Sequence, residues 1–550
     1  MKKFEINNIK NIDNIYIKMD YFISNEGYNI NKKILTQEQL KGIINELTVT
    51  PFILEYLRKE GEENTSYELY KNRDDKIIVP IYYGKDKFGE TENKMNIIRT
   101  EFKFKGELRE YQIPIVEKCL TYIKNKGGGL LSIPCGGGKT LIALYIASQL
   151  QLKTLIVVHK TFLMNQWIER IKQFTTAKVG IICRDIIDIE NKDIVIGMIQ
   201  SICKRDYDKK IFEQFSFVIY DEAHHSASKI FSKALMKTPA LHTLALSATP
   251  YRGDQMIKIM HWFLGGTIYR IKFKINKYVI VKCIHYYSYD YLFKERMRYI
   301  KGQNYPDTVN MISNLCKLQN RIETIVNIIN TIIKDPERKI LVLSERKSLL
   351  NKLKEGVDQN KKIETKTYYY IGDMNEQERK EAEMKADIIF ATYQMAKEGL
   401  DIERLNTVIL ATSQKDVIQS VGRIMRKILQ NGDTKPLIID LSDDTSIFIN
   451  HSKIRKSYYT KCEYTIENYY ICDNKCMSHE DYKNKIKEKE YIANNISNYD
   501  EILYTKKILI EDLIGINDVI YENSDNEKDD KKEEEKKKGI DKKRRIIPIE

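Results

Sequence analysis

The chain has 550 residues, of which 42% are hydrophobic, so it is too long for one core and can fill three or four. Its 91 lysines and arginines outnumber its 77 acidic residues, and the net charge of +14 favours a polyanionic partner. No apolar run approaches the roughly 18 residues of a membrane span, and the polar start lacks the apolar core of a signal peptide. The nine cysteines are scattered and do not form a disulfide pattern. We therefore expect a soluble intracellular protein with no membrane partner.

The region before Gly106 has strand signals of its own. The clearest is residues 76–84, a run of apolar and aromatic residues interrupted by one proline. β-Branched and aromatic residues of this kind are typical of strands. We interpret residues 1–105 as a small N-terminal α+β accessory domain.

Five apolar strand candidates follow between Leu130 and Thr249, and they alternate with helical or loop segments. They are residues 130–133, 154–159, 194–198, 217–220 and 243–246. Continuous apolar strands that alternate with helices predict a parallel sheet covered by helices on both faces. Residues 106–253 are therefore predicted to form one α/β domain.

The first of these strands leads into a glycine-rich loop that is typical of nucleotide-binding proteins. The loop and the start of the following helix consist of Pro134, Cys135, Gly136, Gly137, Gly138, Lys139 and Thr140. Backbone N–H groups at a helix N-terminus can hold phosphate, Lys139 can reach the β and γ oxygens, and Thr140 can bind Mg²⁺. Ile133 stands where the usual pattern has its first glycine, so the interpretation rests also on the apolar strand before the loop and the helix 139–150 after it.

Asp221 and Glu222 supply the carboxylates that triphosphate hydrolysis needs. They directly follow the apolar strand 217–220. Asp221 is predicted to hold the metal and Glu222 to activate water. An acidic pair alone is more often surface charge, but together with the phosphate loop it predicts binding and hydrolysis of a nucleoside triphosphate.

A second series of apolar strands follows the turn at Asp335 and Pro336, and it has no phosphate loop. Its candidates are residues 340–343, 367–371, 388–391, 408–411 and 437–441. They predict a second α/β domain over residues 336–445, with the active site in a cleft between the two domains. Residues 254–335, with a β-rich part at 267–287 and a helix at 307–333, are interpreted as an insertion or a connector.

Two arginines of the second domain are spaced to face one phosphate. Arg423 and Arg426 lie three residues apart on a helix that is predicted to begin near Asp416. An arginine finger stabilises charge on the γ-phosphate and contributes roughly 10³ to 10⁵ in rate. Because Lys139 belongs to the other domain, hydrolysis is predicted to accompany closure of the cleft.

Several hydroxyl and turn residues follow strands of the two domains. Ser247 and Thr249 could relay the state of the cleft to a bound polymer, although an ordinary strand-ending turn is the alternative. Thr392, Gly399 and Asp401 could bridge nucleotide and polymer. The sequence leaves these assignments open.

The end of the chain is polar. Residues 446–521 form a tyrosine-rich C-terminal extension, and residues 522–550 are a charged tail that is predicted to be disordered. Cys462, Cys472, Cys476 and His479 could bind zinc, but the spacing C-x9-C-x3-C-x2-H fits no common zinc pattern, so we favour scattered cysteines.

Seven segments in order resemble the motif set of superfamily 2 helicases. They are residues 108–112, 134–140, 166–167, 221–224, 247–249, 398–401 and 419–426, and the resemblance covers roughly residues 106–441. The phosphate loop is similar to that of the xeroderma pigmentosum group B branch. Residues 78–89 resemble helicases of large nucleocytoplasmic DNA viruses, including the poxvirus transcript-release helicase. The resemblance implies an α/β fold with two tandem RecA-like domains.

The resemblance also implies a role for each matching residue. Gln112 and Arg109 would contact adenine, and His224 would couple the γ-phosphate to the polymer groove. Gln419 would lie near the γ-phosphate and the attacking water, with Arg423 and Arg426 as fingers. Trp167 we interpret as a packing residue rather than a stacking platform.

The implied activity is that of an ATP-dependent helicase or translocase that uses ATP and Mg²⁺. Its track would be nucleic acid, with DNA favoured over RNA, and its partners could include RNA polymerase or other transcription proteins of a virus. The expected place is the host cytoplasm at a viral factory, or the virion, with the nucleus as an alternative. The basic residues 542–545 could be a nuclear signal or a nucleic-acid contact, and a solvated disordered end is an equal alternative. The alternative function is an ATP-switched remodelling subunit of a transcription or repair complex that separates no strands.

Overall fold

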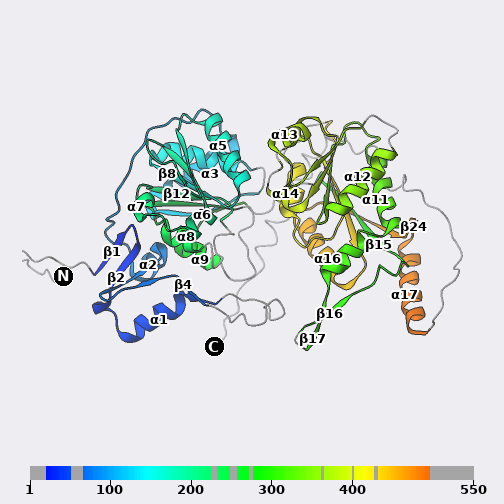
Figure 1. Cartoon of the computed structure of the whole chain (residues 1–550), viewed down its shortest axis with the longest axis horizontal. Helices are drawn as coiled ribbons and strands as arrows, with labels where there is room; N and C mark the ends of the chain where they lie inside the picture. Colours follow the sequence, from blue (N-terminus) through cyan, green and yellow to red (C-terminus); the bar gives the residue numbers. More distant parts are fainter. Residues whose placement is uncertain are drawn as a thin grey trace, which may run out of the picture. The chain divides into compact units, whose positions relative to one another are not determined.

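The computed structural model describes residues 20–50, 66–134, 137–223, 232–247, 257–271, 277–300, 302–360, 365–398, 400, 402–425 and 432–495. The chain divides into two compact units, Met1–Lys272 and Phe273–Glu550. Each unit contains an eight-stranded sheet with helices on both faces (Figure 1). The predicted fold class, two tandem RecA-like α/β domains, is confirmed. Among the helices of the described ranges, none has the length and apolar character of a membrane span.

The large sheet of the first unit has the strand order β10-β9-β11-β8-β12-β13-β7-β14. Every neighbouring pair is parallel except β10 with β9. The bounds are β7 (Gly128–Ser132), β8 (Thr154–Val158), β9 (Val179–Cys183), β10 (Ile186–Ile187), β11 (Ile194–Met198), β12 (Phe217–Tyr220), β13 (His242–Ser247) and β14 (Thr267–Arg270). All five strands predicted for this domain are confirmed, because their apolar runs are buried on both faces.

Helices cover both faces of this sheet and complete its two cores. On one face lie α3 (Ile113–Lys126), α4 (Lys139–Leu150) and α5 (Thr161–Phe174), preceded by the 3-10 turn η3 (Glu110–Gln112). On the other face lie α6 (Ile199–Lys204), α7 (Lys209–Phe212), α8 (Ser232–Lys237) and α9 (Ile257–Leu264). The helix predicted over residues 139–150 is confirmed as α4.

The N-terminal region forms the α+β module that its strand signals predicted. Its four-stranded sheet has the order β1-β2-β6-β5. The elements are β1 (Tyr21–Ser24), β2 (Gly27–Asn31), η1 (Lys32–Ile34), α1 (Gln37–Leu47), β3 (Thr48–Val49), β4 (Tyr67–Glu68), β5 (Lys71–Asn72), β6 (Lys76–Val79) and α2 (Ile81–Phe88). The strand signal over residues 76–84 was only half right, because the strand ends at Val79 and Pro80 precedes a helix. Proline has a backbone φ suited to a helix start and has no N–H to leave unpaired there.

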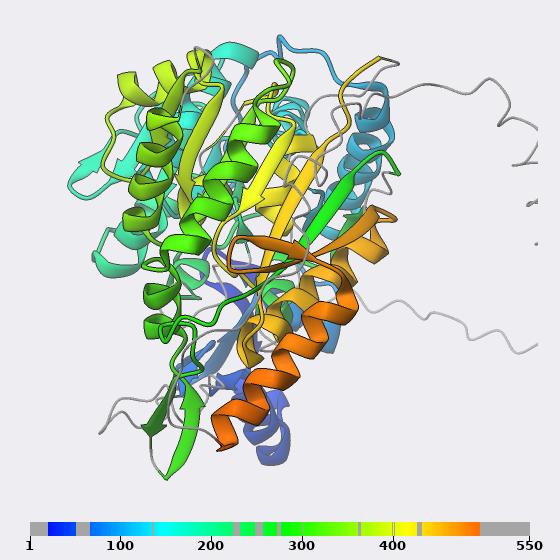
Figure 2. The ribbon, with the colours of Figure 1, turned by 90° about the vertical axis from the view of Figure 1, so that its right-hand side faces the viewer.

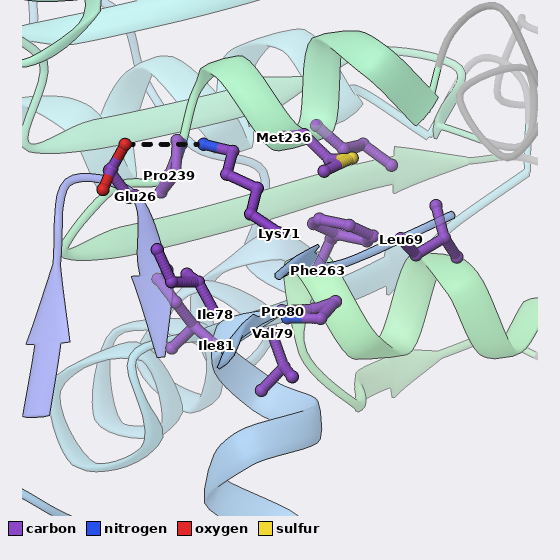
Figure 3. Close-up of a pocket in the computed structure, with 12 residues that line it drawn as sticks. Glu26, Leu69, Lys71, Ile78, Val79, Pro80, Ile81, Met236, Pro239 and Phe263 are labelled. Atoms are coloured by element: carbon purple, nitrogen blue, oxygen red, sulfur yellow. Dashed lines mark ion pairs between the residues drawn. The ribbon is translucent and has the colours of Figure 1, made fainter. Parts of the chain in front are cut away.

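The N-terminal module packs against the first large sheet through α2 and α9, and both contribute to one core cluster. Tyr82 and Thr243 share a buried hydrogen bond of 2.9 Å between their hydroxyl oxygens. The ring of Tyr83 meets Trp262 edge-on at 5.6 Å between centroids. Figure 3 shows the seam, where Lys71 points toward Glu26. The cavity drawn there measures about 20 Å³. A larger cavity of about 290 Å³ lies beside it and shares Glu26, Lys71 and Met236 with it.

Gly84 in α2 tests how tightly this module is packed. A Cβ at Gly84 would lie 2.2 Å from Cγ of the buried Tyr28. We expect Gly84→Ala to lower the free energy of unfolding of the first unit by roughly 1–3 kcal/mol, because the ring must move. Gly42→Ala is the matched control in α1, where an added Cβ meets nothing within 4 Å, and it should stabilise by about 0.5–1 kcal/mol. Urea unfolding measures both, and equal stability of Gly84→Ala and wild type would contradict the close packing.

The sheet of the second unit has the order β19-β20-β18-β21-β22-β15-β23-β24. Every neighbouring pair is parallel except β23 with β24. The bounds are β15 (Ile280–Tyr287), β18 (Ile340–Ser344), β19 (Thr367–Tyr370), β20 (Ile388–Thr392), β21 (Thr407–Leu410), β22 (Leu437–Asp443), β23 (Thr465–Cys472) and β24 (Lys475–Met477). The five strands predicted for this domain are confirmed, and β15, β23 and β24 extend the sheet beyond them (Figure 2).

Residues 254–335 are divided between the two units. β14 joins the first sheet, whereas β15 lies between β22 and β23 in the second. The helix predicted over residues 307–333 is two helices, α10 (Thr308–Leu315) and α11 (Gln319–Ile332), separated by buried Cys316 and Leu318. No glycine or proline marks that break, so local sequence carries no sign of it.

The remaining helices of the second unit cover both faces of its sheet. They are α12 (Lys347–Gln359), α13 (Glu376–Lys385), α14 (Tyr393–Glu398), α15 (Ile418–Val421), the 3-10 turn η5 (Gly422–Met425), α16 (Ser446–Lys461) and α17 (His479–Asn495). Between β15 and α10, β16 (Met297–Ile300) and β17 (Gln303–Pro306) form a separate two-stranded hairpin.

Candidate active site

Three neighbouring strands of the first sheet carry the predicted nucleotide-site residues at their carboxyl ends. β7 leads into the phosphate loop, β12 leads into Asp221 and Glu222, and β13, which ends at Ser247, lies between them. The carboxyl ends of parallel strands share one edge of the sheet, where ligands bind in α/β proteins. Ser247 is fully buried, and its carbonyl accepts a hydrogen bond of 3.2 Å from the N–H of Ile133. This bond fixes the backbone directly before the loop.

The described part of the phosphate loop has room only for glycine. Gly138 has a φ of +75°, and a Cβ there would lie 2.2 Å from Nε2 of Gln112. A Cβ on Gly137 would lie 2.3 Å from Cγ2 of Ile133. The N–H of Gly137 donates to the carbonyl of Pro134 over 3.2 Å, which turns the chain toward the N-terminus of α4. A bare backbone before a helix N-terminus is the arrangement that holds phosphate.

Lys139 and Glu222 approach one another across the edge of the sheet. Nζ of Lys139 lies 3.5 Å from Oε1 of Glu222, and the two side chains are 12% and 19% exposed. Glu222 has the uncommon φ of 47°, so the backbone turns sharply just after Asp221. An ammonium, the Thr140 hydroxyl position at the start of α4 and two carboxylates at one edge form a set that fits a triphosphate with a divalent cation.

Asp221 is buried and held from two sides. Its Oδ2 accepts a hydrogen bond of 2.9 Å from Nε1 of Trp167, and its Oδ1 accepts one of 2.9 Å from the N–H of Glu222. Burial, with the nearby charge of Glu222, raises the pKa of Asp221 to about 6, although Lys139 opposes the shift. A divalent cation at this carboxylate would favour its ionised form.

Trp167 is therefore more than a packing residue. Its predicted burial is confirmed, since it is 2% exposed, but its indole N–H also orients Asp221. The sequence contained one sign of this second role, because a buried tryptophan needs an acceptor for its N–H.

Gln112 is tied to the phosphate loop. Its Nε2 donates to the carbonyl of Gly137 over 3.2 Å, and its Oε1 accepts from the N–H of Arg109 over 2.9 Å. Gln112 is buried, whereas Arg109 is exposed. A nucleotide contact by Gln112 would thus be transmitted directly to the loop; the adenine role of both residues stays a prediction.

The described predicted residues of the second unit are Thr392, Gln419 and Arg423, and they lie at or after the carboxyl ends of β20 and β21. Thr392 ends β20, and its Oγ1 accepts from the N–H of Met395 over 3.4 Å. Gln419 lies in α15 and Arg423 in the following turn η5, and only their backbone is described. The predicted residues that lie outside the described ranges are Cys135, Gly136, His224, Thr249, Gly399, Asp401 and Arg426.

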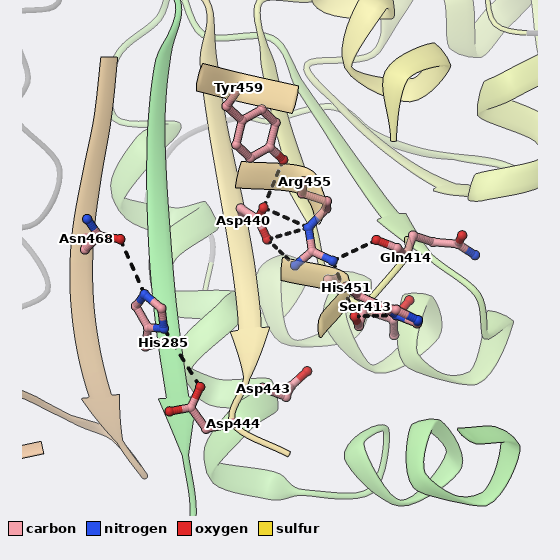
Figure 4. Close-up of polar contacts among 12 residues, drawn as sticks. His285, Ser413, Gln414, Asp440, Asp443, Asp444, His451, Arg455, Tyr459 and Asn468 are labelled. Atoms are coloured by element: carbon pink, nitrogen blue, oxygen red, sulfur yellow. Dashed lines mark hydrogen bonds and ion pairs between the residues drawn. The ribbon is translucent and has the colours of Figure 1, made fainter. Parts of the chain in front are cut away.

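Three buried side chains hold the segment 411–414, which follows β21 and leads toward α15. Arg321 of α11 donates to the carbonyl of Ala411 over 2.9 Å. Tyr393 of α14 donates to the carbonyl of Thr412 over 2.6 Å. Arg455 of α16 donates to the carbonyl of Gln414 over 2.7 Å (Figure 4). The approach to Gln419 and Arg423 is thus fixed from three helices, and we name these three side chains the carbonyl clamp.

Two buried carboxylates hold the arginines of the carbonyl clamp. Asp440 lies 2.7 Å from Nη2 of Arg455 and also accepts from the Tyr459 hydroxyl over 2.9 Å (Figure 4). Asp443 lies 2.6 Å from Nε of Arg321. Burial alone would lower the pKa of Arg455, but the Asp440 carboxylate outweighs it and raises the pKa. Sequence reasoning missed this network, although a charged residue inside the apolar strand 437–443 was a signal that a buried partner exists.

The four zinc candidates do not come together. Cys462 belongs to the core on one face of the second sheet, and Cys472 and Cys476 belong to the core on the other face. Within the described part of the chain, no three histidine, cysteine or acidic side chains are grouped as a metal site would require.

Comparison with known proteins identifies both units. Residues 105–252 match the family of the type III restriction enzyme res subunit, and residues 320–427 match the helicase conserved C-terminal domain. A protein of Acanthamoeba polyphaga mimivirus named as an ATP-dependent RNA helicase is 37% identical over 506 residues, 91% of this chain and 92% of that protein. A helicase of Invertebrate iridescent virus 6 is 30% identical over 403 residues, 68% of this chain and 86% of that one.

A more distant relative is the DNA 3'-5' translocase of Sulfurisphaera tokodaii, which is 26% identical over 387 residues, 62% of this chain and 82% of that protein. The similarity to the mimivirus protein spans nearly the full length of both chains. ATP use and nucleic-acid binding follow from that relationship, as the motif order predicted. The chain belongs to the superfamily 2 helicases and is similar to ATP-dependent helicases of large DNA viruses.

Proposed function

We propose that the protein is a motor that hydrolyses Mg²⁺-ATP at the edge occupied by Lys139, Asp221 and Glu222 and thereby moves along nucleic acid. The observation that carries this proposal is the 3.5 Å approach of Lys139 to Glu222 beside a loop in which Gly137 and Gly138 have no room for a side chain. The N-terminus of α4 lies at the same edge. The phosphates would therefore bind at the helix N-terminus, apart from the carboxylates at the end of β12.

Each residue of the proposed site has its own role in the reaction. Backbone N–H groups of the loop and the ammonium of Lys139 hold the phosphates, and Asp221 with Thr140 would hold Mg²⁺, which neutralises their charge. Glu222 orients water so that its oxygen attacks the γ-phosphorus, while the bond to the β–γ bridging oxygen breaks and ADP leaves. Trp167 keeps the carboxylate of Asp221 in place.

Arg423 would complete the site from the second unit. A guanidinium that meets the γ-phosphate only in the closed state stabilises the transition state more than bound ATP. We expect Arg423→Ala to lower kcat about 10³-fold or more, with a much smaller change in the KM for ATP. Steady-state ATPase kinetics measure this, with Arg379→Ala, at a partly exposed arginine of α13, as the control. A rise in KM with unchanged kcat would contradict the finger assignment.

The proposed track is DNA and the proposed setting is viral transcription, with RNA polymerase or other transcription proteins as partners and the viral factory of the host cytoplasm as the place. The viral relatives support the setting. The names of the relatives point to both polymers, because the mimivirus relative is named for RNA and the Sulfurisphaera tokodaii relative for DNA.

The deciding experiment is the ATPase activity of the purified full chain without polymer and with single-stranded DNA, duplex DNA or single-stranded RNA at one fixed salt concentration. Stimulation identifies a polymer-driven motor, and the polymer that stimulates most is its track. Salt must be fixed because phosphate contacts lose affinity steeply as salt rises. Hydrolysis without any stimulation would favour the ATP-switched remodelling subunit instead.

A further inference from the structure

The larger cavity beside the seam of the first unit is lined from two sides. The N-terminal module contributes the turn of Asn25 and Glu26 between β1 and β2, and Lys71 of β5. Helices α7 and α8 and the segments next to them contribute the rest. One water molecule needs only about 10–15 Å³. The volume of about 290 Å³ is therefore no packing gap, and it is close to the roughly 300 Å³ at which small-molecule sites begin.

Part of this lining is aromatic and apolar. Phe212 of α7 is buried, and the ring of Tyr207 meets it edge-on with 6.1 Å between the centroids. Met236 of α8 and Pro239 extend the same apolar lining. Both of these residues also line the small cavity at the seam (Figure 3). A flat ring in the larger cavity would bury its apolar surface against these side chains.

Near Glu26 the lining has more cations than carboxylates. Oε1 of Glu26 lies 2.7 Å from Nη2 of Arg73, 3.2 Å from Nζ of Lys209 and 4.0 Å from Nζ of Lys71. Three cations thus share one carboxylate, and they attract a further anion. Burial lowers the pKa of Lys71, Glu26 opposes this shift, and the charges of Lys209 and Arg73 add to it. An anion bound beside Lys71 would stabilise its charged form.

Helix α8 adds two more ammonium groups to the lining. Nζ of Lys237 donates to the carbonyl of Arg205 over 2.8 Å and to that of Ile202 over 3.1 Å, which fixes its position. Lys233 is exposed and forms no ion pair with another residue of the described ranges. Cations therefore approach the cavity both from the N-terminal module and from the helices.

Two carboxylates complete the lining. Asp206 and Glu213 are at least partly exposed, and neither pairs with a cation in the described part of the chain. Carboxylates accept hydrogen bonds from hydroxyl and amino groups, and they disfavour a ligand that consists only of negative charge. The lining thus combines a surface for a ring, ammonium groups for a phosphate, and acceptors for hydroxyl or amino groups.

We propose that this cavity is a second nucleotide site, which binds a mononucleotide apart from the edge that carries Lys139. The phosphate lies beside Lys71 and Lys209, and the base lies against Phe212. A phosphate ion would leave the apolar lining uncovered, and an uncharged ring would leave the cations without an added anion. Because the ligand contacts both the N-terminal module and the helices, it ties the two together. The same chemistry is present in a free mononucleotide and at the phosphorylated end of a strand.

The test counts the ADP molecules bound per full-length chain by equilibrium dialysis with radiolabelled ADP. Wild type should bind two. Lys139→Ala should bind one, in the cavity, and the double variant Lys209→Gln with Lys233→Gln should bind one, at the phosphate loop. Loss of two charged contacts should weaken binding in the cavity about 100-fold, since each is worth roughly tenfold. Lys210→Gln is the control, because this exposed lysine of α7 does not line the cavity, and it should bind two.

The double variant should fold, because both lysines are exposed and Arg73 still pairs with Glu26, and circular dichroism checks this. Two sites in the double variant would overturn the proposal, as would a wild type with one site that Lys139→Ala removes. A single wild-type site that the double variant loses and Lys139→Ala keeps would leave the cavity site standing and remove the phosphate-loop assignment.

Competition against ADP bound in the cavity of Lys139→Ala identifies the ligand. AMP should displace it at a concentration at least about tenfold lower than inorganic phosphate or adenosine, because each of these fills only part of the cavity. Equal displacement by inorganic phosphate would overturn a nucleotide site in favour of a simple anion site. Displacement by a single strand with a 5′-phosphate, but not with a 5′-hydroxyl, assigns the site to a strand end. Displacement by AMP and by neither strand assigns it to a free nucleotide.

Discussion

Lys139→Ala is expected to lower ATP turnover at least about 10²–10³-fold, because it removes the positive charge that stabilises the transferring phosphate. Glu222→Gln is expected to lower turnover about 10²–10⁴-fold through loss of the group that orients the attacking water. The two variants should differ in binding, since Glu222→Gln can leave the phosphate loop intact and retain ATP, whereas loss of the Lys139 ammonium weakens the hold on the phosphates. Steady-state hydrolysis and equilibrium binding of a fluorescent ATP analogue measure the two effects.

Matched controls come from exposed residues of α3 in the same unit. Lys124→Ala and Glu117→Gln make the same chemical changes on a solvent-facing part of that helix and should leave turnover unchanged. Normal turnover in either site variant would remove the assignment of the active site to the carboxyl ends of β7 and β12.

The second large effect is expected at the carbonyl clamp. Arg455 and Asp440 are each 1% exposed, and Arg455 also holds the carbonyl of Gln414. We expect Arg455→Met to lower the free energy of unfolding of the second unit by about 3–5 kcal/mol, because the Asp440 carboxylate is left buried without its partner. Urea unfolding followed by circular dichroism measures the loss, as a separate transition of the second unit.

A double variant separates stability from catalysis. Arg455→Met combined with Asp440→Leu leaves no unpaired buried charge and should recover most of the lost stability. It should not recover polymer-stimulated ATPase, because the segment that leads to Gln419 and Arg423 still lacks one of its three supports. Full recovery of both properties would show that the pair serves folding alone.

Tyr393→Phe tests the same clamp with a smaller change. It deletes only the hydroxyl that donates to the carbonyl of Thr412. We expect it to reduce kcat with a loss of about 1 kcal/mol in stability, the usual contribution of one hydrogen bond. ATPase kinetics and urea unfolding measure both effects. An unchanged kcat would mean that the hydrogen bond from Tyr393 to Thr412 does not influence the position of Arg423.

The residues of the proposed nucleotide site could be chosen from the sequence because the pattern that marks them is local. Gly137, Gly138, Lys139 and Thr140 follow an apolar strand within a few residues, and the strand after which Asp221 stands is equally apolar. Parallel strands bring their carboxyl ends to one edge whatever the loops between them. The ten strands predicted for the two sheets are also present. Nine of them are apolar runs that are almost fully buried, whereas β19 is a half-buried edge strand rich in tyrosine.

The partners of those residues depend on contacts between distant segments, which no local pattern encodes. Trp167 reaches Asp221 across 54 residues, Tyr393 reaches Thr412 across 19 and Arg321 reaches Asp443 across 122. The same holds for β15 and β23, which the sequence placed outside the second domain and the fold inserts into its sheet.

By itself the sequence determined the family and the segments that become the central strands, and it placed the proposed phosphate loop, because glycine spacing, apolar runs and motif order are properties of neighbouring residues. Only the tertiary structure decided which buried groups orient Asp221, which three side chains hold the approach to Arg423, and that residues 297–300 pair with residues 303–306 in a separate hairpin. Buried polar groups must find partners wherever the fold supplies them, and an exposed ribbon is recognised only when nothing in the described part of the chain covers it.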